Sequence, residues 1–356
     1  MKRYIKPVLF LNGLLFSMFL FSSCQAQPSA GRKYNVGFTI INLASATDPS
    51  GTISVAVWYP TGTPERKYQY GGPAWGNIAP ESAPLADAGK FPFLAFSHGY
   101  GGCGLGSAFF TEALASQGWI VACPDHHDSY SFFRLRTGRV KNISRKGALK
   151  DLKELVSSSP EDKNKYLFRP MELEEVIEGM ISSERFGRLI DTGRIAAGGH
   201  SFGGFTSMGL CGTIPSLYDH RIKALLLFST GAAAYLFTAG EMQKVSIPSM
   251  LLMGSREENQ YRGNRTMGEL SESIYANMPQ PKYFLEVKGG NHFSFNNRLS
   301  YGFGTRALSG NEREFEVITR YSLAFLKKYV AGINDREGVL SKKDKMISHM
   351  ESSVVE

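Results

Sequence analysis

The sequence reads Gly199-His200-Ser201-Phe202-Gly203 near its middle, and this Gly-x-Ser-x-Gly pentapeptide is the strongest indication of its architecture. Residues 194–197 before it are predicted to form a short strand, and a helix-like stretch follows it. The glycines leave room for a tight turn that lifts the serine hydroxyl to the carboxyl end of a sheet. Such a segment also arises by chance as a Gly-rich turn with an idle serine. Here the preceding strand and the additional Gly204 favour Ser201 as a nucleophile.

On both sides of this motif, sequence patterns typical of strands alternate along the chain with patterns typical of helices. Apolar runs predict buried strands at 91–97, 119–123, 221–228, 249–253 and 283–287, and an alternating run predicts another at 52–60. Helical patterns lie at 109–117, 171–183 and 312–330, with a weaker one near 147–156. This alternation predicts an α/β protein, with a mostly parallel sheet covered by helices on both faces. Residues 61–90, rich in Gly, Pro and Ala, are predicted to form a long loop.

A second glycine-rich segment follows the strand at 91–97 and reads Ser97-His98-Gly99-Tyr100-Gly101-Gly102. Acyl transfer builds an oxyanion, which preorganised backbone N–H groups stabilise. The amides of Phe202 and Tyr100 are the predicted donors of this oxyanion hole. A flexible connection without such a role is the alternative. His98 is expected to be a packed structural residue, because the base follows the nucleophile in chains that carry this motif.

His292 lies in a loop directly after the last predicted strand and is the predicted general base, which takes the Ser201 proton and later protonates the leaving group. An acid is expected between these two residues, at the carboxyl end of a strand. Other acids in the interval precede a strand, lie inside one, follow none closely or fall on a helical face: Asp219, Glu286, Glu241, Glu269 and Glu272. Glu257 is favoured because it lies three residues after the strand-terminal Gly254, and Glu258 is the alternative. If both are solvated loop charges, neither serves the base.

Residues 126–168 are polar, basic and irregular, and they are predicted to form an excursion over the cleft. At its start, Asp125-His126-His127-Asp128 looks like a metal cluster. Consecutive side chains do not easily converge on one ion, however, and the Cys/His spacings of zinc sites are absent. We therefore expect no metal and no cofactor, with contact to substrate at the cleft rim as the alternative role. The aromatic residues Tyr130, Phe132 and Phe133 are expected to form an apolar wall or to pack in the core.

The N-terminus has the pattern of an export signal, with basic residues before an apolar run at 8–21. This run is shorter than the roughly 20 residues of a membrane span. Phe21-Ser22-Ser23-Cys24 resembles a bacterial lipobox, which predicts a signal peptide at 1–23, lipidation of Cys24 and a tether at 24–34. Cleavage after Ala26 is the alternative. We expect an exported protein, either a membrane-anchored bacterial lipoprotein or a periplasmic or secreted one.

The charge and the cysteine count of the chain speak against a nucleic-acid partner and against a complete disulfide framework. Without residues 1–23, the chain carries 37 basic and 32 acidic residues, a net charge of +5 with no basic run, so no nucleic-acid partner is expected. With Cys24 lipidated, the three cysteines left make no complete disulfide framework, although a Cys103–Cys211 bridge is conceivable. The suspected catalytic residues are spread widely along the chain, which predicts one domain at 35–331. The charged residues 332–356 are predicted to be a loose tail.

Three segments together carry a family resemblance: Phe91-Pro92-Phe93-Leu94-Ala95-Phe96-Ser97-His98-Gly99-Tyr100-Gly101, Gln117-Gly118-Trp119-Ile120-Val121-Ala122 and Gly199-His200-Ser201-Phe202-Gly203-Gly204. They resemble the platelet-activating-factor acetylhydrolase group of α/β-hydrolases, whose bacterial relatives shade into dienelactone-hydrolase-like and polyester-hydrolase-like esterases. The resemblance covers most of 50–330. It implies the α/β-hydrolase fold and a Ser-acid-His mechanism, without metal, on short or oxidised acyl esters. In the animal acetylhydrolases the acid follows the strand just after the nucleophile helix, whereas residues 227–230 here contain none. The acid therefore resembles the bacterial esterase arrangement, after the next strand.

These observations predict a serine carboxylic-ester hydrolase that acts on short-acyl esters through Ser201, Glu257 and His292 and an acyl-enzyme intermediate. The expected substrate is a small-molecule or lipid ester, and contact with a membrane is expected only through the N-terminal anchor. The alternatives are a cutinase-like polyester hydrolase, a lipase-type esterase for longer chains, or a non-catalytic binding protein on the same fold.

Overall fold

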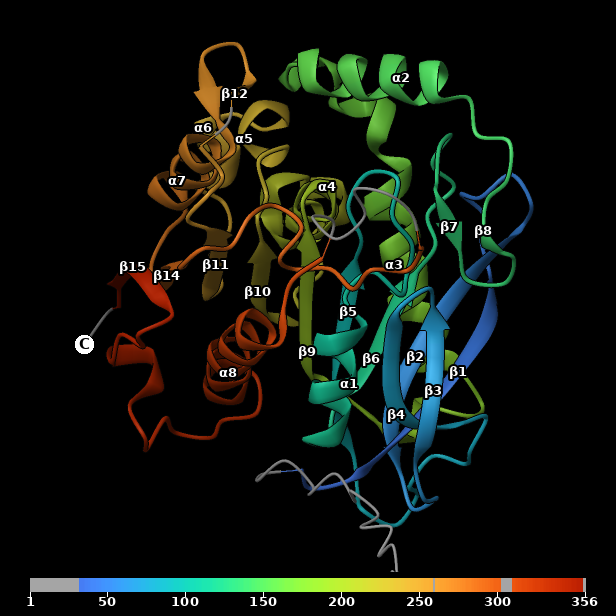
Figure 1. The fold of residues 1–356 in the computed structure, drawn as a ribbon. Coiled ribbons are helices and arrows are strands. Elements are labelled where there is room, and N and C mark those ends of the chain that lie inside the picture. Colours follow the sequence, from blue (N-terminus) through green and yellow to red (C-terminus); the bar gives the residue numbers. More distant parts are fainter. Residues whose placement is uncertain (1–31, 259, 302–308, 355–356) are drawn as a thin grey trace, which may run out of the picture. The chain divides into compact units, whose positions relative to one another are not determined.

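An 11-stranded sheet runs through the protein in the order β15-β14-β11-β10-β9-β5-β6-β2-β1-β4-β3 (Figure 1). Its middle consists of parallel neighbours: β6 (Ile120–Pro124), β5 (Phe91–Ser97), β9 (Ile190–His200), β10 (Ile222–Phe228), β11 (Ser249–Gly254) and β14 (Lys282–Val287). Every residue of β5, β6 and β11 is buried, as expected for strands covered on both faces.

The computed structural model describes residues 32–258, 260–301 and 309–354. The predicted signal peptide at 1–23, the lipidation at Cys24 and nearly all of the tether at 24–34 lie outside these residues. Arg32–Glu356 forms one compact unit. Within the described residues, no helix combines the length and the apolar character needed to cross a membrane. Cys103, Cys123 and Cys211 are all buried and free, so the bridge between the first and last of these is not formed.

A mostly antiparallel margin completes one side of the sheet and corrects the predicted loop at 61–90. β1 (Asn35–Ala44) and β2 (Thr52–Thr61) pair antiparallel and join the margin to β6. β3 (Arg66–Gly71) and β4 (Ala74–Pro80) form a hairpin inside the supposed loop. This hairpin lies at the sheet edge, and five of the six residues of β3 are partly or fully exposed without a regular alternation. The sequence therefore lacks the pattern that usually indicates a strand.

The prediction of a loose tail at 332–356 is also wrong in part. β15 (Ile347–Ser353) pairs antiparallel with β14 in six residue pairs and closes the opposite edge of the sheet. Leu340 and Ile347 are buried against the core beneath it. Backbone hydrogen bonds and two apolar anchors are enough to hold this strand, although its composition is largely polar.

Helices cover both faces of the sheet, and each face has its own apolar cluster. α1 (Ala108–Ser116) and α8 (Glu312–Tyr329) pack on one face, while α3 (Phe168–Ser182), α4 (Phe202–Met208) and α7 (Met267–Asn277) pack on the other. α2 (Arg145–Ser157) runs past the carboxyl ends of the central strands (Figure 1). The remaining short elements are β7 (Phe133–Arg134), β8 (Gly138–Arg139), α5 (Ala233–Leu236), α6 (Ala239–Met242), β12 (Gln260–Arg262), β13 (Arg265–Thr266) and the turns η1 (Pro160–Tyr166), η2 (Gly187–Leu189), η3 (Gly209–Thr213), η4 (Pro215–Leu217) and η6 (Val339–Ser341).

Candidate active site

Ser201 occupies a strained turn between β9 and α4. Its φ of 56° and ψ of −118° are rare for a residue with a side chain. The turn is held at both backbone atoms, because the Ser201 amide donates to Phe228 O at 2.9 Å and Thr230 Oγ1 donates to Ser201 O at 2.7 Å. The end of β10 therefore fixes the position from which the Ser201 hydroxyl projects.

The two glycines of the motif are required by close backbone packing. A Cβ on Gly199 would lie 2.3 Å from Gly203 O, and a Cβ on Gly203 would lie 2.1 Å from Ser97 O. No side chain fits at either position without moving a backbone segment. The Gly-x-Ser-x-Gly spacing thus follows from the approach of α4 to both β9 and the end of β5.

His292 stands in the loop after β14, with Nε2 2.9 Å from Ser201 Oγ. His200 supports this loop from the other side of the nucleophile, with Nε2 2.8 Å from the His292 carbonyl oxygen. Burial, and next the proximity of His292, lower the pKa of His200 to about 3. His200 is therefore neutral and donates to that carbonyl. The sequence analysis did not assign it a role, since this contact joins residues that are 92 positions apart.

The structure brings Glu257, and not the exposed Glu258, to His292. The Glu257 carboxylate is almost fully buried, with Oε2 3.4 Å from His292 Nδ1. Its Oε1 accepts a hydrogen bond of 2.6 Å from the Gly254 amide at the end of β11. The spacing of three residues between Gly254 and Glu257 is therefore what turns the carboxylate back toward the end of the strand.

Ser229 lies between this acid and the histidine, and the sequence analysis missed it. Its Oγ lies 2.6 Å from His292 Nδ1 and donates to Glu257 Oε2 at 2.5 Å. The side chain is fully buried, and the backbone takes a φ of 42° directly after β10. The only signal in the sequence was its position at a strand's carboxyl end, where the absence of an acid was noted.

The predicted oxyanion donors lie beside the nucleophile. The Gly99 backbone comes so close that a Cβ built there would be 2.9 Å from Ser201 Cβ. Within the described part of the chain, the amides of Tyr100 and Phe202 donate to no protein acceptor. Tyr100 also anchors its loop, because its hydroxyl donates to Ala148 O of α2 at 2.9 Å. Two unused amides next to a serine hydroxyl are the arrangement that oxyanion binding needs.

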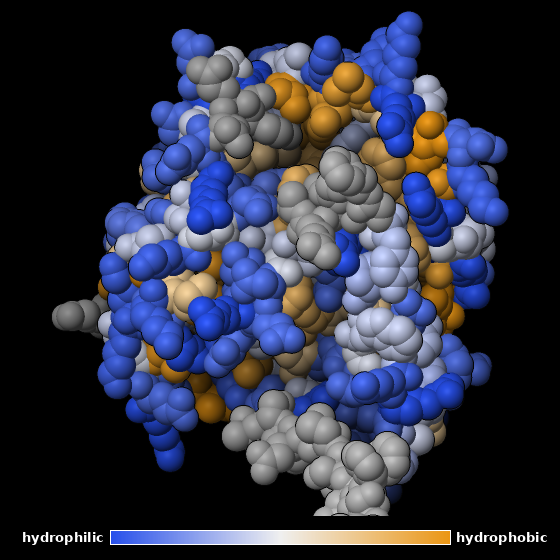
Figure 2. Space-filling view, in the orientation of Figure 1, coloured by the Kyte–Doolittle hydropathy of each residue, from blue (hydrophilic) through white to orange (hydrophobic). Residues whose placement is uncertain are grey.

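A cavity of about 580 Å³ opens onto Ser201 and His292. Its walls are largely apolar, and the excursion at 126–168 supplies Phe132, Phe133, Arg145, Ala148, Leu149 and Leu152. Of its lining residues, Arg145 and Arg298 carry a charge and none is acidic. Hydrophobic side chains also gather at the top of the face in Figure 2, where Figure 1 places α2. Tyr130 lies instead beside Gly147 of α2.

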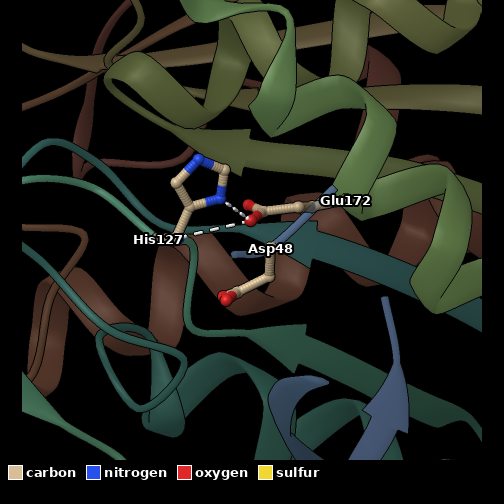
Figure 3. Close-up of side chains that lie close together, drawn as sticks. All are labelled: Asp48, His127 and Glu172. Atoms are coloured by element: carbon tan, nitrogen blue, oxygen red, sulfur yellow. Dashed lines mark hydrogen bonds and ion pairs between the residues drawn. The ribbon is translucent and has the colours of Figure 1, made fainter. Parts of the chain in front are cut away.

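The His-His pair of the excursion converges on one carboxylate of α3, and Figure 3 shows His127 of this pair beside Glu172 and Asp48. His126 Nδ1 lies 2.7 Å from Glu172 Oε2, and His127 Nδ1 bonds Glu172 Oε1. Asp48 lies close to these atoms, and the three ligand atoms of Asp48, His127 and Glu172 are all within 4.8 Å of one another. Each carboxylate already accepts a hydrogen bond from the protein, that of Asp48 from the Ser50 amide. Hydrogen bonds thus join His126 and His127 to Glu172, whereas the Asp48 carboxylate accepts from the Ser50 amide of its own turn.

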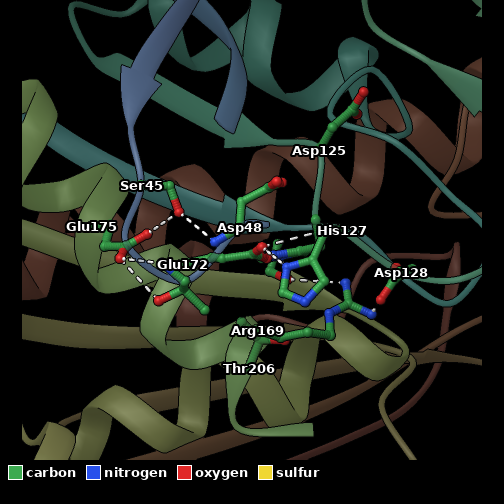
Figure 4. A network of polar contacts seen from close by, with 12 residues as sticks. Ser45, Asp48, Asp125, His127, Asp128, Arg169, Glu172, Glu175 and Thr206 are labelled. Carbon is green, nitrogen blue, oxygen red and sulfur yellow. Dashed lines mark hydrogen bonds and ion pairs between the residues drawn. The ribbon is translucent and has the colours of Figure 1, made fainter. Parts of the chain in front are cut away.

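A buried arginine links this network to the oxyanion loop (Figure 4). Arg169 Nη2 donates to His98 O at 2.5 Å, and its guanidinium lies 4.5 Å from the centre of the Phe202 ring. Arg169 Nη1 lies 3.5 Å from Asp128 Oδ2, which offsets part of the buried charge. Burial lowers the pKa of His98 well below its usual value. His98 is therefore a neutral, packed residue, as predicted from its place in the chain.

Comparison with known proteins adds family information to this geometry. The family model described as platelet-activating factor acetylhydrolase, isoform II, matches residues 74–169. A platelet-activating factor acetylhydrolase from Cavia porcellus is 26% identical over 283 residues, which are 70% of this chain and 60% of that protein. This chain therefore spans 60% of that relative's length. A solved structure of a ferulic acid esterase from Streptomyces cinnamoneus matches with a TM-score of 0.68 at 19% identity, over 92% of this chain and 98% of that one.

The chain has the α/β-hydrolase fold. The predicted fold class is confirmed, and both sequence comparisons confirm the resemblance to the acetylhydrolase group. The family match at 74–169 contains the oxyanion loop and the excursion, whereas Ser201, Glu257 and His292 lie beyond it. Assignment of these three residues therefore rests on the geometry of this chain and not on the family match.

Proposed function

We propose that this chain is a serine carboxylic-ester hydrolase that acts on short-acyl esters through an acyl-enzyme intermediate. One observation carries the proposal. Ser201 Oγ lies 2.9 Å from His292 Nε2 on a cavity that Tyr100 also lines, and the amides of Tyr100 and Phe202 donate to no protein acceptor in the described part of the chain. A nucleophile with a base in hydrogen-bond reach and an oxyanion site beside it is the arrangement that acyl transfer requires.

The reaction assigns one task to each group. His292 Nε2 takes the proton of Ser201 as Oγ bonds to the ester carbonyl carbon. The Tyr100 and Phe202 amides stabilise the oxyanion, which collapses as the C–O bond to the alcohol breaks and His292 returns the proton to the leaving oxygen. Water then attacks the acyl-enzyme with the same base and releases the acid. Glu257 is the carboxylate that stabilises the imidazolium in both steps.

The size and lining of the cavity support an ester with a compact acyl group. A volume of about 580 Å³ is within the range of pockets for small molecules, and its apolar walls suit acyl or aryl groups. The name of one relative points the same way, since it is an acetylhydrolase. Membrane attachment through Cys24, or release into the periplasm or the medium, stays a prediction from the N-terminal sequence.

The test is hydrolysis of p-nitrophenyl acetate by the protein without residues 1–23, measured beside the variant Ser201→Ala. Turnover that disappears in the variant supports the proposal. Turnover that survives in Ser201→Ala refutes the assignment of the nucleophile. If neither protein turns over any ester, although Ser201→Ala is folded by circular dichroism, the non-catalytic binding protein is the better reading.

A longer or aromatic ester is the second candidate, because large apolar side chains stand exposed at the cavity. Phe132, Leu149 and Phe293 have exposed fractions of 50%, 54% and 40% and all line the cavity. A lipase-type or cutinase-like activity would use such a rim to hold an extended apolar chain. A series of p-nitrophenyl esters from acetate to palmitate separates the candidates, since activity that peaks at long chains contradicts the short-acyl proposal.

A further inference from the structure

We propose that Ser229 is a positioning residue that couples His292 to Glu257, so that the imidazole is held by a hydroxyl rather than directly by the acid. This inference rests on the proposed function. The distances carry it, because His292 Nδ1 lies 2.6 Å from Ser229 Oγ but 3.4 Å from Glu257 Oε2. A polar contact of 3.4 Å is near the limit of a hydrogen bond, whereas 2.6 Å is short.

The direction of both hydrogen bonds follows from the groups involved. The Ser229 hydroxyl has one proton and donates it to Glu257 Oε2 at 2.5 Å. Its lone pair is then left to accept from His292 Nδ1–H. A protonated Nδ1 leaves Nε2 free to accept the proton of Ser201, which lies 2.9 Å away. Ser229 therefore selects the tautomer that a general base needs.

The backbone around Ser229 is built to place this hydroxyl. The Ser229 amide donates to Leu252 O at 2.7 Å, which fixes the residue between β10 and β11. Its φ of 42° lies in the left-handed region, which a residue with a side chain enters only at a cost in free energy. Glycine would remove that strain but also the hydroxyl. A strained conformation kept by a fully buried serine indicates that the side chain itself is required.

The hydroxyl also explains how Glu257 serves the base from this position. The carboxylate is held by Gly254 N at 2.6 Å and by the Ser229 hydroxyl. When His292 gains a proton, its Nδ1–H bond to Ser229 strengthens, and Ser229 in turn polarises toward the carboxylate. No proton has to leave Ser229 in this cycle. The acid thus stabilises the imidazolium through an intermediate group.

The test compares Ser229→Ala with Ser249→Ala, a matched control in which an equally buried serine hydroxyl on β11 has no partner among the described residues. The first readout is the pH dependence of Ser201 phosphonylation by a p-nitrophenyl alkylphosphonate. Loss of the coupling should lower the rate about 10- to 100-fold and move the acid limb of the profile to lower pH, because the imidazolium is less stabilised. Ser249→Ala should match the wild type in both respects.

The second readout does not require activity. In the ¹H NMR spectrum, the downfield imidazole N–H signal that disappears in His292→Ala should shift or vanish in Ser229→Ala and persist in Ser249→Ala. An unchanged signal and an unchanged pH profile in a folded Ser229→Ala protein overturn the inference. A wild-type protein that is not phosphonylated instead refutes the proposed function, and the NMR comparison still decides the role of Ser229.

Discussion

The described part of the molecule contains two arrays in which a serine hydroxyl faces a histidine Nε2 and a glutamate lies on the Nδ1 side, and one of the two opens to a cavity. In the first, Ser201 Oγ meets His292 Nε2 at 2.9 Å, and Nδ1 faces Glu257 through Ser229. In the second, Ser97 Oγ meets His126 Nε2 at 2.8 Å, and Nδ1 meets Glu172 Oε2 at 2.7 Å. All three side chains of the second array are buried, with no measurable exposure for any of them.

The difference shows that three groups in hydrogen-bond order do not make an active site. Ser97 ends a regular strand, whereas Ser201 sits on a turn with positive φ that lifts its hydroxyl toward the cavity. Burial also lowers the pKa of His126 well below its usual value, so this imidazole resists the proton that a general base must accept. The buried array instead ties β5 and the excursion to α3, beneath the oxyanion loop. We infer that it supports the geometry of the other array.

The largest expected contrast is between the two serines. Ser201→Ala should lower kcat for p-nitrophenyl acetate by a factor of about 10⁶, as in related triads. Ser97→Ala should lower it by no more than about tenfold, because the loss of one buried hydrogen bond loosens the oxyanion loop but removes no reacting group. The measurement is kcat for both variants, with thermal unfolding to verify the fold. Equal losses would mean that the two arrays are not functionally distinct.

The second-largest difference in kcat is expected between variants of the two glutamates, Glu257 and Glu172. Glu257→Gln should reduce kcat about 10³- to 10⁴-fold, because an amide no longer stabilises the imidazolium. Burial raises the pKa of the Glu172 carboxyl to about 8, so this side chain is mostly uncharged at pH 7. The substitution Glu172→Gln therefore leaves the charge at this position nearly unchanged. The latter variant should stay within a few-fold of the wild-type kcat. A comparable loss in the two variants at pH 7 would contradict the assignment of Glu257 as the triad acid.

The positive charge of Arg298 in the cavity should have a smaller effect than the losses of kcat above, and this effect concerns the choice between substrates. Arg298 lines a cavity without acidic side chains, so an ester that carries a carboxylate should be favoured over a neutral ester of equal length. Arg298→Gln should reduce the ratio of kcat/KM for mono-(4-nitrophenyl) succinate over 4-nitrophenyl pentanoate about fivefold, which corresponds to about 1 kcal/mol. Arg139→Gln is the matched control, since Arg139 is exposed and lies outside the cavity lining. A ratio that Arg298→Gln leaves unchanged would show that this charge does not reach the substrate.

The buried His200, which holds the loop of His292, should make the free energy of unfolding depend on pH. The pKa of His200, lowered by burial to about 3, lies below the unfolded value of 6.5, so the unfolded state binds one more proton between these limits. The contribution of His200 is therefore complete above pH 6.5 and is lost as the pH falls toward 3. His200→Gln should remove about 1.4 kcal/mol per pH unit from the slope of the unfolding free energy in that window, measured by urea titration. The exposed His220 provides the control variant, His220→Gln, which makes the same substitution outside the site.

Local patterns in the sequence were sufficient for the central part of the molecule and insufficient at its margins. Apolar runs and glycine motifs located the parallel strands, the nucleophile turn and the oxyanion loop, because each depends on residues close together in the chain. The edge hairpin and β15 lack such patterns, since edge strands keep polar side chains. Ser229 could not be predicted for a different reason. Its partners lie 28 and 63 residues away, and only the folded sheet brings these three residues together.

The structure predicts that the open array reacts and that the sealed one does not. Incubation with a p-nitrophenyl alkylphosphonate, followed by mass spectrometry of the digested protein, tests it directly. We expect one phosphonyl group per chain, attached to the peptide that contains Ser201, and none on the peptide that contains Ser97. A label on Ser97, or an unlabelled Ser201 in folded protein at neutral pH, would contradict the account.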